Sequence, residues 1–347
     1  MSKKQNGEYM NKTKFGIREY SALIVCFIIG LFSVSIMLFT DNSSPKNKNE
    51  TSNESIENSK EGYEIIDLLS SESEVIFSID DTFEEISEEK DTFDIVEIES
   101  SSVHKGNLIL VNKNNPYVFS EEDNVFDVYD LKTTKYKLGT GEEKLFEKTI
   151  LSANDFLGDF YDLSGKTNVT MINGYITKEE QQQKYEQYIK SVSAEEAQKW
   201  GIKAGTSDHH TGLSFNLMLY PSGGKIGEGE YSWLTENAHR YGFILRYPSE
   251  KSEITQVKDD NHFRYVGVPH AEYIYSNKLT LEEYISELEK TSYSSPLRIE
   301  FGNEEYIVYY SPADKTVSKT EIKIPNGMSY DISGDNSNGF IITVYNS

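Results

Sequence analysis

The chain of 347 residues is long enough for one substantial domain and a smaller one, and its 37% hydrophobic and 12% aromatic content excludes a wholly disordered protein. Its formal net charge of -23 excludes nucleic-acid binding, because contacts to phosphates need clustered Lys and Arg. The single cysteine, Cys26, excludes an intramolecular disulfide and a Cys-rich metal site.

An apolar run near the N-terminus predicts a membrane anchor. Residues 20–40, YSALIVCFIIGLFSVSIMLFT, carry no charge and match the roughly 20 residues that a helix needs to cross a bilayer. A cleaved signal peptide is the alternative, but its apolar stretch is typically about 7 to 15 residues and ends in small residues. This run is longer and is followed by DNSS, so we expect one uncleaved transmembrane helix.

The residues around this helix predict its orientation. A basic cytoplasmic tail, 1–19, precedes it, and Asp41 with a polar stretch follows it. The excess of Lys and Arg on the cytoplasmic side then places everything after residue 40 outside the membrane. Residues 41–62 have almost no large apolar side chains and predict a flexible spacer.

The next region, 63–106, is acidic. Residues 61–100 contain fifteen Asp and Glu against a single Lys, Lys90. Such a run is commonly a solvated stretch, and a docking surface for cations or a basic partner is the alternative. Alternating segments such as DIVEIE favour strands within this region.

The main domain is expected at 107–290. NLILVN predicts a strand at 107–112, and a helix is expected over 142–161. Three pairs that form capping boxes predict helix starts, namely Thr177 with Glu180, Ser193 with Glu196 and Thr280 with Glu283. A further helix over 232–241 should end at Gly242, and NVTMIN, FILRY and HFRYVGV are typical strand segments.

Helices and strands are mixed without regular βαβ alternation, so the predicted fold class is α+β. Beyond the break at TSYSSP, the short strand-like runs LRIEFG, EEYIVYYS, TEIKIP and GFIITVYN follow one another between turn residues. They predict a small all-β unit at 297–347.

Two histidine-centred segments could carry chemistry. SDHHTG at 207–212 leads to Asn216, and DDNHFRY occupies 259–265. Each places His and short polar residues beside a predicted strand, which is where zinc ligands are often found. On this pattern alone, surface or hydrogen-bonded histidines are the commoner explanation.

A family resemblance favours the metal-site interpretation. SDHHTGLSFNL at 207–217 is similar to the S-x-H-x-x-G-x-x-x-D signature of VanY-type zinc D-alanyl-D-alanine carboxypeptidases. Further segments match that family in the same order: LILVNKNNP, NGYITKEEQ, WLTENAHRYGFILRYP, EIT and HFRYVGVPHA. The resemblance covers about 107–290 and implies a core of mixed helices and an antiparallel sheet.

The resemblance also implies roles for individual residues. Zinc would be held at His209, Asn216 and His262, and Asp259 stands where the family has the Glu that serves as general base. Three further positions would bind substrate, namely Ser207, Tyr175 and Gln181.

Four of the matched positions depart from the family pattern. Asn216 replaces an Asp ligand, Asp259 replaces the longer Glu, Asn261 replaces a Trp, and Ile176 replaces an Arg that could clamp a carboxylate. The zinc affinity should fall because a charged ligand has become a neutral amide. His210 and Asp208 are candidates to take its place.

These departures predict a pseudoenzyme: a protein anchored in the cell membrane, with its domain outside, that binds a peptidoglycan stem peptide or a cell-wall protein without cleaving it. The alternative is an active zinc D,D-carboxypeptidase with a rearranged site, supported by the retained His209, His262 and Asp259. A structural or adhesive role for the acidic region and for 297–347 is a third hypothesis. The sequence leaves catalytic activity open.

Overall fold

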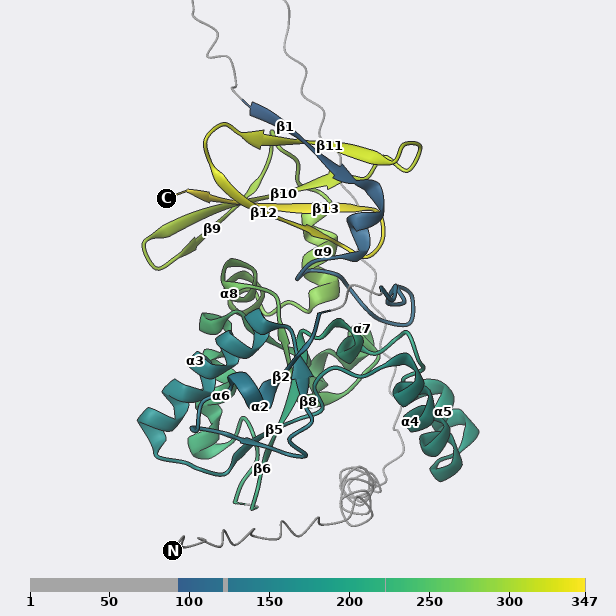
Figure 1. The fold of residues 1–347 in the computed structure, drawn as a ribbon, viewed down its shortest axis with the longest axis vertical. Helices are drawn as coiled ribbons and strands as arrows, with labels where there is room; N and C mark the ends of the chain where they lie inside the picture. Colours follow the sequence, from purple (N-terminus) through teal and green to yellow (C-terminus); the bar gives the residue numbers. More distant parts are fainter. Residues whose placement is uncertain (1–92, 121–123, 222, 347) are drawn as a thin grey trace, which may run out of the picture. The chain divides into compact units, whose positions relative to one another are not determined.

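The computed structural model describes residues 93–120, 124–221 and 223–346 (Figure 1). The predictions for the basic tail, the transmembrane helix at 20–40, the spacer at 41–62 and most of the acidic region lie outside the described residues. Within the described ranges, no helix has both the length and the apolar character needed to span a bilayer. These residues all fall in one compact unit, Glu84–Ser347.

A five-stranded sheet lies at the centre of the 107–290 domain. Its strands follow the order β3-β5-β6-β8-β7, with bounds Lys137–Leu138, Val169–Ile172, Ser214–Leu219, Asp259–Tyr265 and Phe243–Tyr247. Strands β3 and β5 are parallel, and the other neighbours are antiparallel. NVTMIN, FILRY and HFRYVGV supply β5, β7 and β8, so the predicted α+β class with an antiparallel sheet is confirmed.

Helix α3, Glu147–Ser164, packs its apolar side chains against this sheet. Its buried residues recur at three- and four-residue spacing, and Phe156 contacts the rings of Phe243 and Phe263 at centroid distances of 5.8 and 5.7 Å. The helix begins later than the predicted residue 142. The reason is that Lys144–Leu145 forms a short strand, β4, which pairs with β2, Phe126–Asp127.

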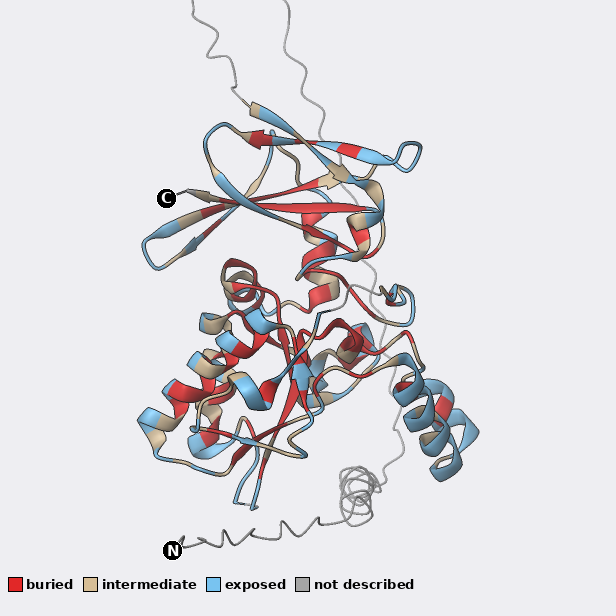
Figure 2. Cartoon of the chain, viewed as in Figure 1, coloured by how far each residue is buried: buried red, intermediate tan, exposed pale blue. Residues whose placement is uncertain are grey.

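All three predicted capping boxes start helices. These are α4 (Lys178–Ser191), α5 (Ala194–Trp200) and α9 (Leu281–Leu288). In each one the N-cap hydroxyl accepts the N3 amide and the Glu at N3 accepts the N-cap amide. Helices α4 and α5 are largely exposed (Figure 2), whereas α9 buries an apolar face.

The remaining elements of this domain are short. They are α2 (Val128–Leu131), η2 (Asp208–Thr211), η3 (Gly229–Tyr231), α6 (Ser232–Asn237), η4 (Ala238–Tyr241), η5 (Ser249–Lys251), α7 (Ser252–Thr255) and α8 (Val268–Ser276). The helix predicted over 232–241 is α6 continued by the 3-10 turn η4. It ends as predicted at Gly242, whose φ of 82° favours glycine.

The C-terminal strands form the predicted all-β unit. An antiparallel sheet has the order β12-β13-β10-β9, with bounds Ser329–Gly334, Gly339–Asn346, Glu304–Pro312 and Leu297–Phe301. Strand β11, Lys319–Pro325, pairs instead with β1, Phe93–Glu99, from the acidic region (Figure 1). A 3-10 turn, η1 (Ser100–His104), follows β1. We call residues 93–106 and 297–346 together the β unit.

Residues 107–111 form no strand, which corrects the prediction made from NLILVN. The segment is buried, but its carbonyls bond to side chains from distant parts of the chain. The guanidinium of Arg264 donates to the carbonyls of Asn107 and Ile109 at 3.0 and 3.1 Å. The side-chain amide of Asn336 donates to the carbonyl of Leu110 at 3.0 Å. Buried carbonyls need partners, and here buried side chains supply what a neighbouring strand would otherwise provide.

The β unit and the 107–290 domain share one hydrophobic core. Helices α8 and α9 pack with β9, β10 and β13 in a cluster that includes Ile274, Leu281, Ile285, Leu288, Ile299, Val308 and Ile341. Within it, His270 of α8 bonds to the hydroxyls of Tyr284 in α9 and Thr343 in β13, at 2.7 and 3.0 Å. Removing 297–347 would therefore expose this core, so that deletion cannot test a separate adhesive role.

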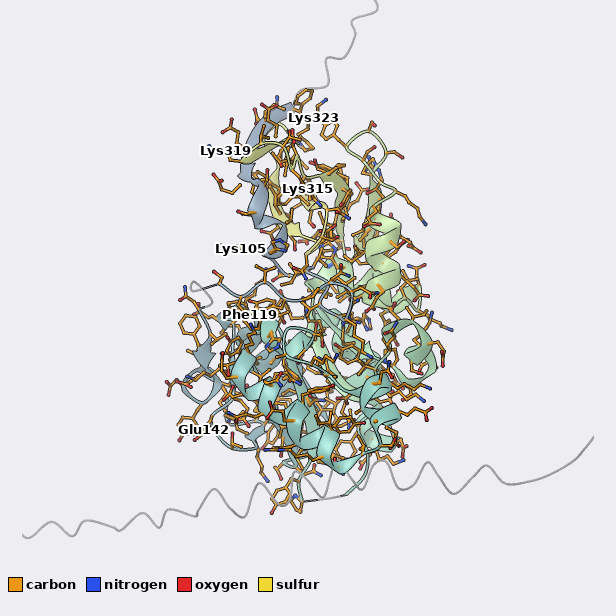
Figure 3. The ribbon with its side chains drawn as sticks, turned by 90° about the vertical axis from the view of Figure 1, so that its right-hand side faces the viewer. Lys105, Phe119, Glu142, Lys315, Lys319 and Lys323 are labelled. Atoms are coloured by element: carbon orange, nitrogen blue, oxygen red, sulfur yellow. The ribbon has the colours of Figure 1, made fainter. Side chains whose placement is uncertain are left out.

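Figure 3 locates several exposed side chains on these two parts. Lys105, Lys315, Lys319 and Lys323 belong to the β unit, and Phe119 and Glu142 belong to the 107–290 domain.

Candidate functional site

Two neighbouring strands bring the candidate site together. Asn216 on β6 and His262 on β8 are direct partners in the antiparallel register, and Asp259 is the first residue of β8. His209 lies in η2, which leads into β6, and Gly212 ends this turn with a φ of 66°. The ring centroids of His209 and His262 consequently lie 4.6 Å apart.

A hydrogen-bonded network joins three of these side chains. Nε2 of His209 lies 3.1 Å from Oδ1 of Asn216, and Nδ2 of Asn216 donates to Oδ2 of Asp259 at 2.8 Å. The carboxylate of Asp259 only accepts hydrogen bonds, so the amide must turn its NH₂ group toward it. Its oxygen then faces His209, whose Nε2 must carry the hydrogen. Asn216 thus bridges the first histidine and the base position.

Burial keeps His209 uncharged. Burial, followed by the positive charge that His262 and Lys184 would add, holds the pKa of His209 well below its usual range. Its Nδ1 has no hydrogen-bond partner within the described residues. The ring therefore uses its one hydrogen for Asn216 and keeps an unsatisfied acceptor on the other side.

The Nε2 atom of His262 faces a buried carboxylate, whereas that of His209 faces an amide. Nε2 of His262 lies 3.2 Å from Oδ2 of the fully buried Asp208. Burial alone would raise the pKa of Asp208, but Arg264, His262 and Arg246 hold it well below its usual range. Because that carboxylate is ionised, Nε2 of His262 donates a hydrogen bond to it and Nδ1 lies on the other side of the ring. A carboxylate behind a histidine in this way is typical of metal-binding imidazoles.

Asp208 is the centre of a buried polar cluster. Beyond His262 it accepts hydrogen bonds from Nη1 of Arg264 and from the hydroxyl of Ser214, and Nε of Arg246 lies 3.7 Å away. The side chains of both arginines are fully buried. This cluster fixes the orientation of the His262 ring from behind.

Neither candidate replacement for the missing Asp ligand is available. Asp208 is committed to the cluster just described. His210 uses both ring nitrogens, since Nδ1 bonds to the carbonyl of Ile176 at 2.7 Å and Nε2 accepts from the amide of Gly205 at 3.0 Å. The idea that Asp208 or His210 could substitute for Asn216 is therefore wrong.

The donor set does not fit the zinc site that the resemblance implies. Catalytic zinc sites use three protein ligands, with a carboxylate often among them. Here the third position is a neutral amide whose oxygen already accepts from His209. Among residues 93–120, 124–221 and 223–346, no group of three or more His, Cys, Asp or Glu could hold a metal ion.

The substrate positions occupy different surroundings. Tyr175 is half-buried and lines an open groove together with Tyr129, Lys144 and Glu180. Gln181 is buried, and its Nε2 donates to the carbonyl of Ile202 at 2.7 Å, so it ties α4 to the following segment.

Two further positions face inward. Ser207 is buried, and its carbonyl accepts the amide of His210 at 3.2 Å. Ile176, at the position of the family's Arg, is also buried and offers no positive charge to a ligand.

Sequence reasoning missed the buried arginines. Arg246 and Arg264 lie in the middle of the strand segments FILRY and HFRYV, where a charged residue interrupts an apolar run. That interruption was the available signal. An arginine inside a buried strand needs a paired partner, because Arg is almost never fully buried without one. The hydrogen-bonded partners of the two arginines could not be found in the same way, since Asp208 is 56 residues from Arg264 and Glu282 is 36 residues from Arg246 along the chain.

Comparison with known proteins gives consistent matches. The family model described as "VanY: D-alanyl-D-alanine carboxypeptidase" matches residues 145–268, a range that contains every candidate site residue. A D-alanyl-D-alanine carboxypeptidase of Enterococcus faecium is 30% identical over 257 residues, covering 72% of this chain and 78% of that protein. Another, from Enterococcus faecalis, is 32% identical and covers 54% of this chain and 69% of its own.

A solved structure extends the likeness beyond the 107–290 domain. The vancomycin-resistance D,D-dipeptidase VanXYg, in complex with a D-Ala-D-Ala phosphinate analogue, is 27% identical with a TM-score of 0.65. The match covers 73% of this chain and 99% of that one. Since 107–290 is only about half of this chain, part of the β unit is included in the likeness.

Proposed function

Because this chain belongs to the VanY family of D-alanyl-D-alanine carboxypeptidases, we propose that it binds peptidoglycan stem peptides ending in D-alanine and does not hydrolyse them. The observation that carries this proposal is the Asn216 amide, which bonds to both His209 and Asp259. By the family resemblance, this amide stands where an Asp would bind zinc.

The surroundings of Asp259 support the loss of hydrolysis. A general base must reach the water that it deprotonates at hydrogen-bond distance. Oδ2 of Asp259 accepts from Asn216 at 2.8 Å, and Oδ1 accepts from the backbone amide of Asn261 at 3.2 Å. Each oxygen therefore already accepts a hydrogen bond from the protein, which competes with a water for the base. The loss of the third ligand charge weakens or abolishes zinc binding.

The same site keeps groups that recognise a peptide. Asp208 holds Nε2 of His262 from behind, so the other ring nitrogen, Nδ1, is the one left for a ligand. Tyr175, which the family resemblance assigns to substrate binding, lines an open groove. A cell-wall protein with an exposed peptide end is the second class of partner.

We also propose that the protein is anchored in the cell membrane by residues 20–40, with its VanY domain outside. The support is the uncharged length of this run and the basic residues that precede it. An extracytoplasmic position is the one at which peptidoglycan stem peptides are met.

The alternative is an active zinc D,D-carboxypeptidase with a rearranged site. It is favoured by the 4.6 Å approach of the two histidine rings and by Asp208 behind His262, both of which suit a bound metal.

Three measurements on the full chain test the proposal: zinc content without added metal, release of D-alanine from a pentapeptide ending in D-Ala-D-Ala, and binding of that peptide by calorimetry. We expect binding without release and zinc well below stoichiometric. Release with stoichiometric zinc would establish the alternative, and absence of binding would overturn both.

A matched variant supplies the positive control. It restores the family residues together, as Ile176→Arg, Asn216→Asp, Asp259→Glu and Asn261→Trp. We expect this variant to bind zinc stoichiometrically and to release D-alanine. If its activity only equals that of the unaltered chain, the four positions do not explain the loss of hydrolysis.

A further inference from the structure

A cavity of about 130 Å³ lies beside the candidate site. It holds about four water molecules, which is room for the end of a short peptide. Lys113, Thr206 and Tyr247 give it a polar side, and Ile202, Ile254 and Val257 give it an apolar wall.

Tyr247 connects this cavity to the site. Its ring packs edge-on against that of His262, with centroids 4.8 Å apart. The residue is only 4% exposed, yet its hydroxyl forms no hydrogen bond within the described part of the chain. Unlike Nδ1 of His209, this hydroxyl is not a fully buried unpaired atom, so it is open to the cavity that Tyr247 lines and can bond to a ligand there.

The charges around the cavity favour an anion. The carboxylate of Glu282 is already neutralised, because both of its oxygens accept from Arg246, at 2.7 and 2.8 Å, and one also accepts from Asn112. Lys113 bonds through Nζ only to the carbonyl of Lys199, at 2.8 Å. Neither Lys113 nor the nearby Lys203 forms an ion pair with a described carboxylate.

The electrostatics of Lys113 agree with this geometry. Burial and the charge of Lys203 both lower the pKa of Lys113. Two neighbouring cations without a counter-charge are each stabilised when an anion binds between them.

We infer that this cavity receives the terminal D-alanine of the bound peptide, with its carboxylate at Lys113 and its methyl group against the apolar wall. Lys113 then supplies the positive charge that Ile176 cannot provide at the position of the family's Arg. Lys acts on a carboxylate as a point charge, without the planar fork of Arg. The inference rests on the proposed function and names the specificity-determining residue of that function.

The test compares two peptides on the full chain by calorimetry: the pentapeptide ending in D-Ala-D-Ala, and the same peptide with a C-terminal amide. The variant Lys113→Gln keeps a donor for the carbonyl of Lys199 but removes the charge. We expect it to bind the acid about tenfold more weakly than the unaltered chain does, and the amide equally well, because a charge-assisted hydrogen bond is lost.

Lys315→Gln is the matched control, since Lys315 is exposed on the β unit (Figure 3) and should leave both affinities unchanged. If the unaltered chain binds neither peptide, the proposed function itself fails. If it binds acid and amide equally and Lys113→Gln has no effect, the peptide binds elsewhere and only this inference is overturned. An equal loss for both peptides would also overturn it, because the charge would then not be what is recognised.

Discussion

Changing Asn216 to Asp should destabilise the metal-free protein. The substitution restores the family's ligand charge, but it replaces an amide that donates to Asp259 with a carboxylate that cannot. The two atoms concerned lie 2.8 Å apart. Two negative charges would then face each other in a partly buried site. In the unaltered protein, a hydrogen bond from the amide occupies this place.

The distance allows an estimate of the cost. At an effective dielectric constant of about 20, two charges roughly 3 Å apart repel by about 5 to 6 kcal/mol. The variant can avoid this repulsion if one of the two carboxylates takes up a proton. For a carboxyl group with an ordinary pKa near 4, protonation costs about 4 kcal/mol at pH 7 and about 1.4 kcal/mol at pH 5, which is less than the repulsion. Because Asp259 is half-exposed, we expect a loss of about 2 to 3 kcal/mol at pH 7 for Asn216→Asp.

The assay is urea unfolding of both proteins at pH 7 and pH 5, with and without zinc. One carboxyl pKa is raised in the folded variant, so its stability deficit should shrink as the pH falls toward that value. Zinc should remove the deficit at pH 7, and so should the second change Asp259→Asn. A variant as stable as the parent at pH 7 without metal would refute the reasoning, as would a deficit that is no smaller at pH 5.

Two further predictions concern the join between the β unit and the 107–290 domain. Burial lowers the pKa of His270 to about 3, so its contribution to stability is present above about pH 6.5 and is lost as the pH falls. Between pH 6 and pH 4 the unaltered chain should lose about 2 kcal/mol more unfolding free energy than His270→Gln, and equal losses would contradict this. Asn336→Ala should cost about 2 to 4 kcal/mol in urea unfolding, because its amide donates to the carbonyls of Leu110, Asn115 and Pro116. Asn336→Gly is the control, because it removes the same hydrogen bonds while glycine tolerates the backbone φ of 69° at this position. If both variants lose less than about 0.5 kcal/mol of unfolding free energy, these bonds add little to stability.

Local signals in the sequence predicted much of the fold. A capping box needs only two residues three positions apart, so the starts of α4, α5 and α9 could be read directly. Short strand-like runs between turn residues predicted β9, β10, β11 and β13 in the same way. Strand β12 was missed because its residues, SYDISG, resemble a turn, and only pairing with β13 makes them a strand.

Non-local contacts account for what the sequence did not predict. The run at 107–111 has the composition of a strand, but its carbonyls are taken by Arg264 and Asn336, which lie far along the chain. The candidate site shows the same division. The motif brings His209 and Asn216 together within one short segment, whereas the bridge from Asn216 to Asp259 depends on the pairing of β6 with β8. Such pairing is decided by packing of the whole sheet.

The pairing of β1 with β11 makes the 107–290 domain an insertion between the first and second strands of the β unit. Both ends of the described chain, Phe93 and Asn346, therefore lie in the same unit. A mechanical load applied across these ends passes first through the seven residue pairs from Phe93↔Pro325 to Glu99↔Lys319. The sheet that holds the two histidines lies off this path, so the binding site is shielded from tension until β1 separates from β11.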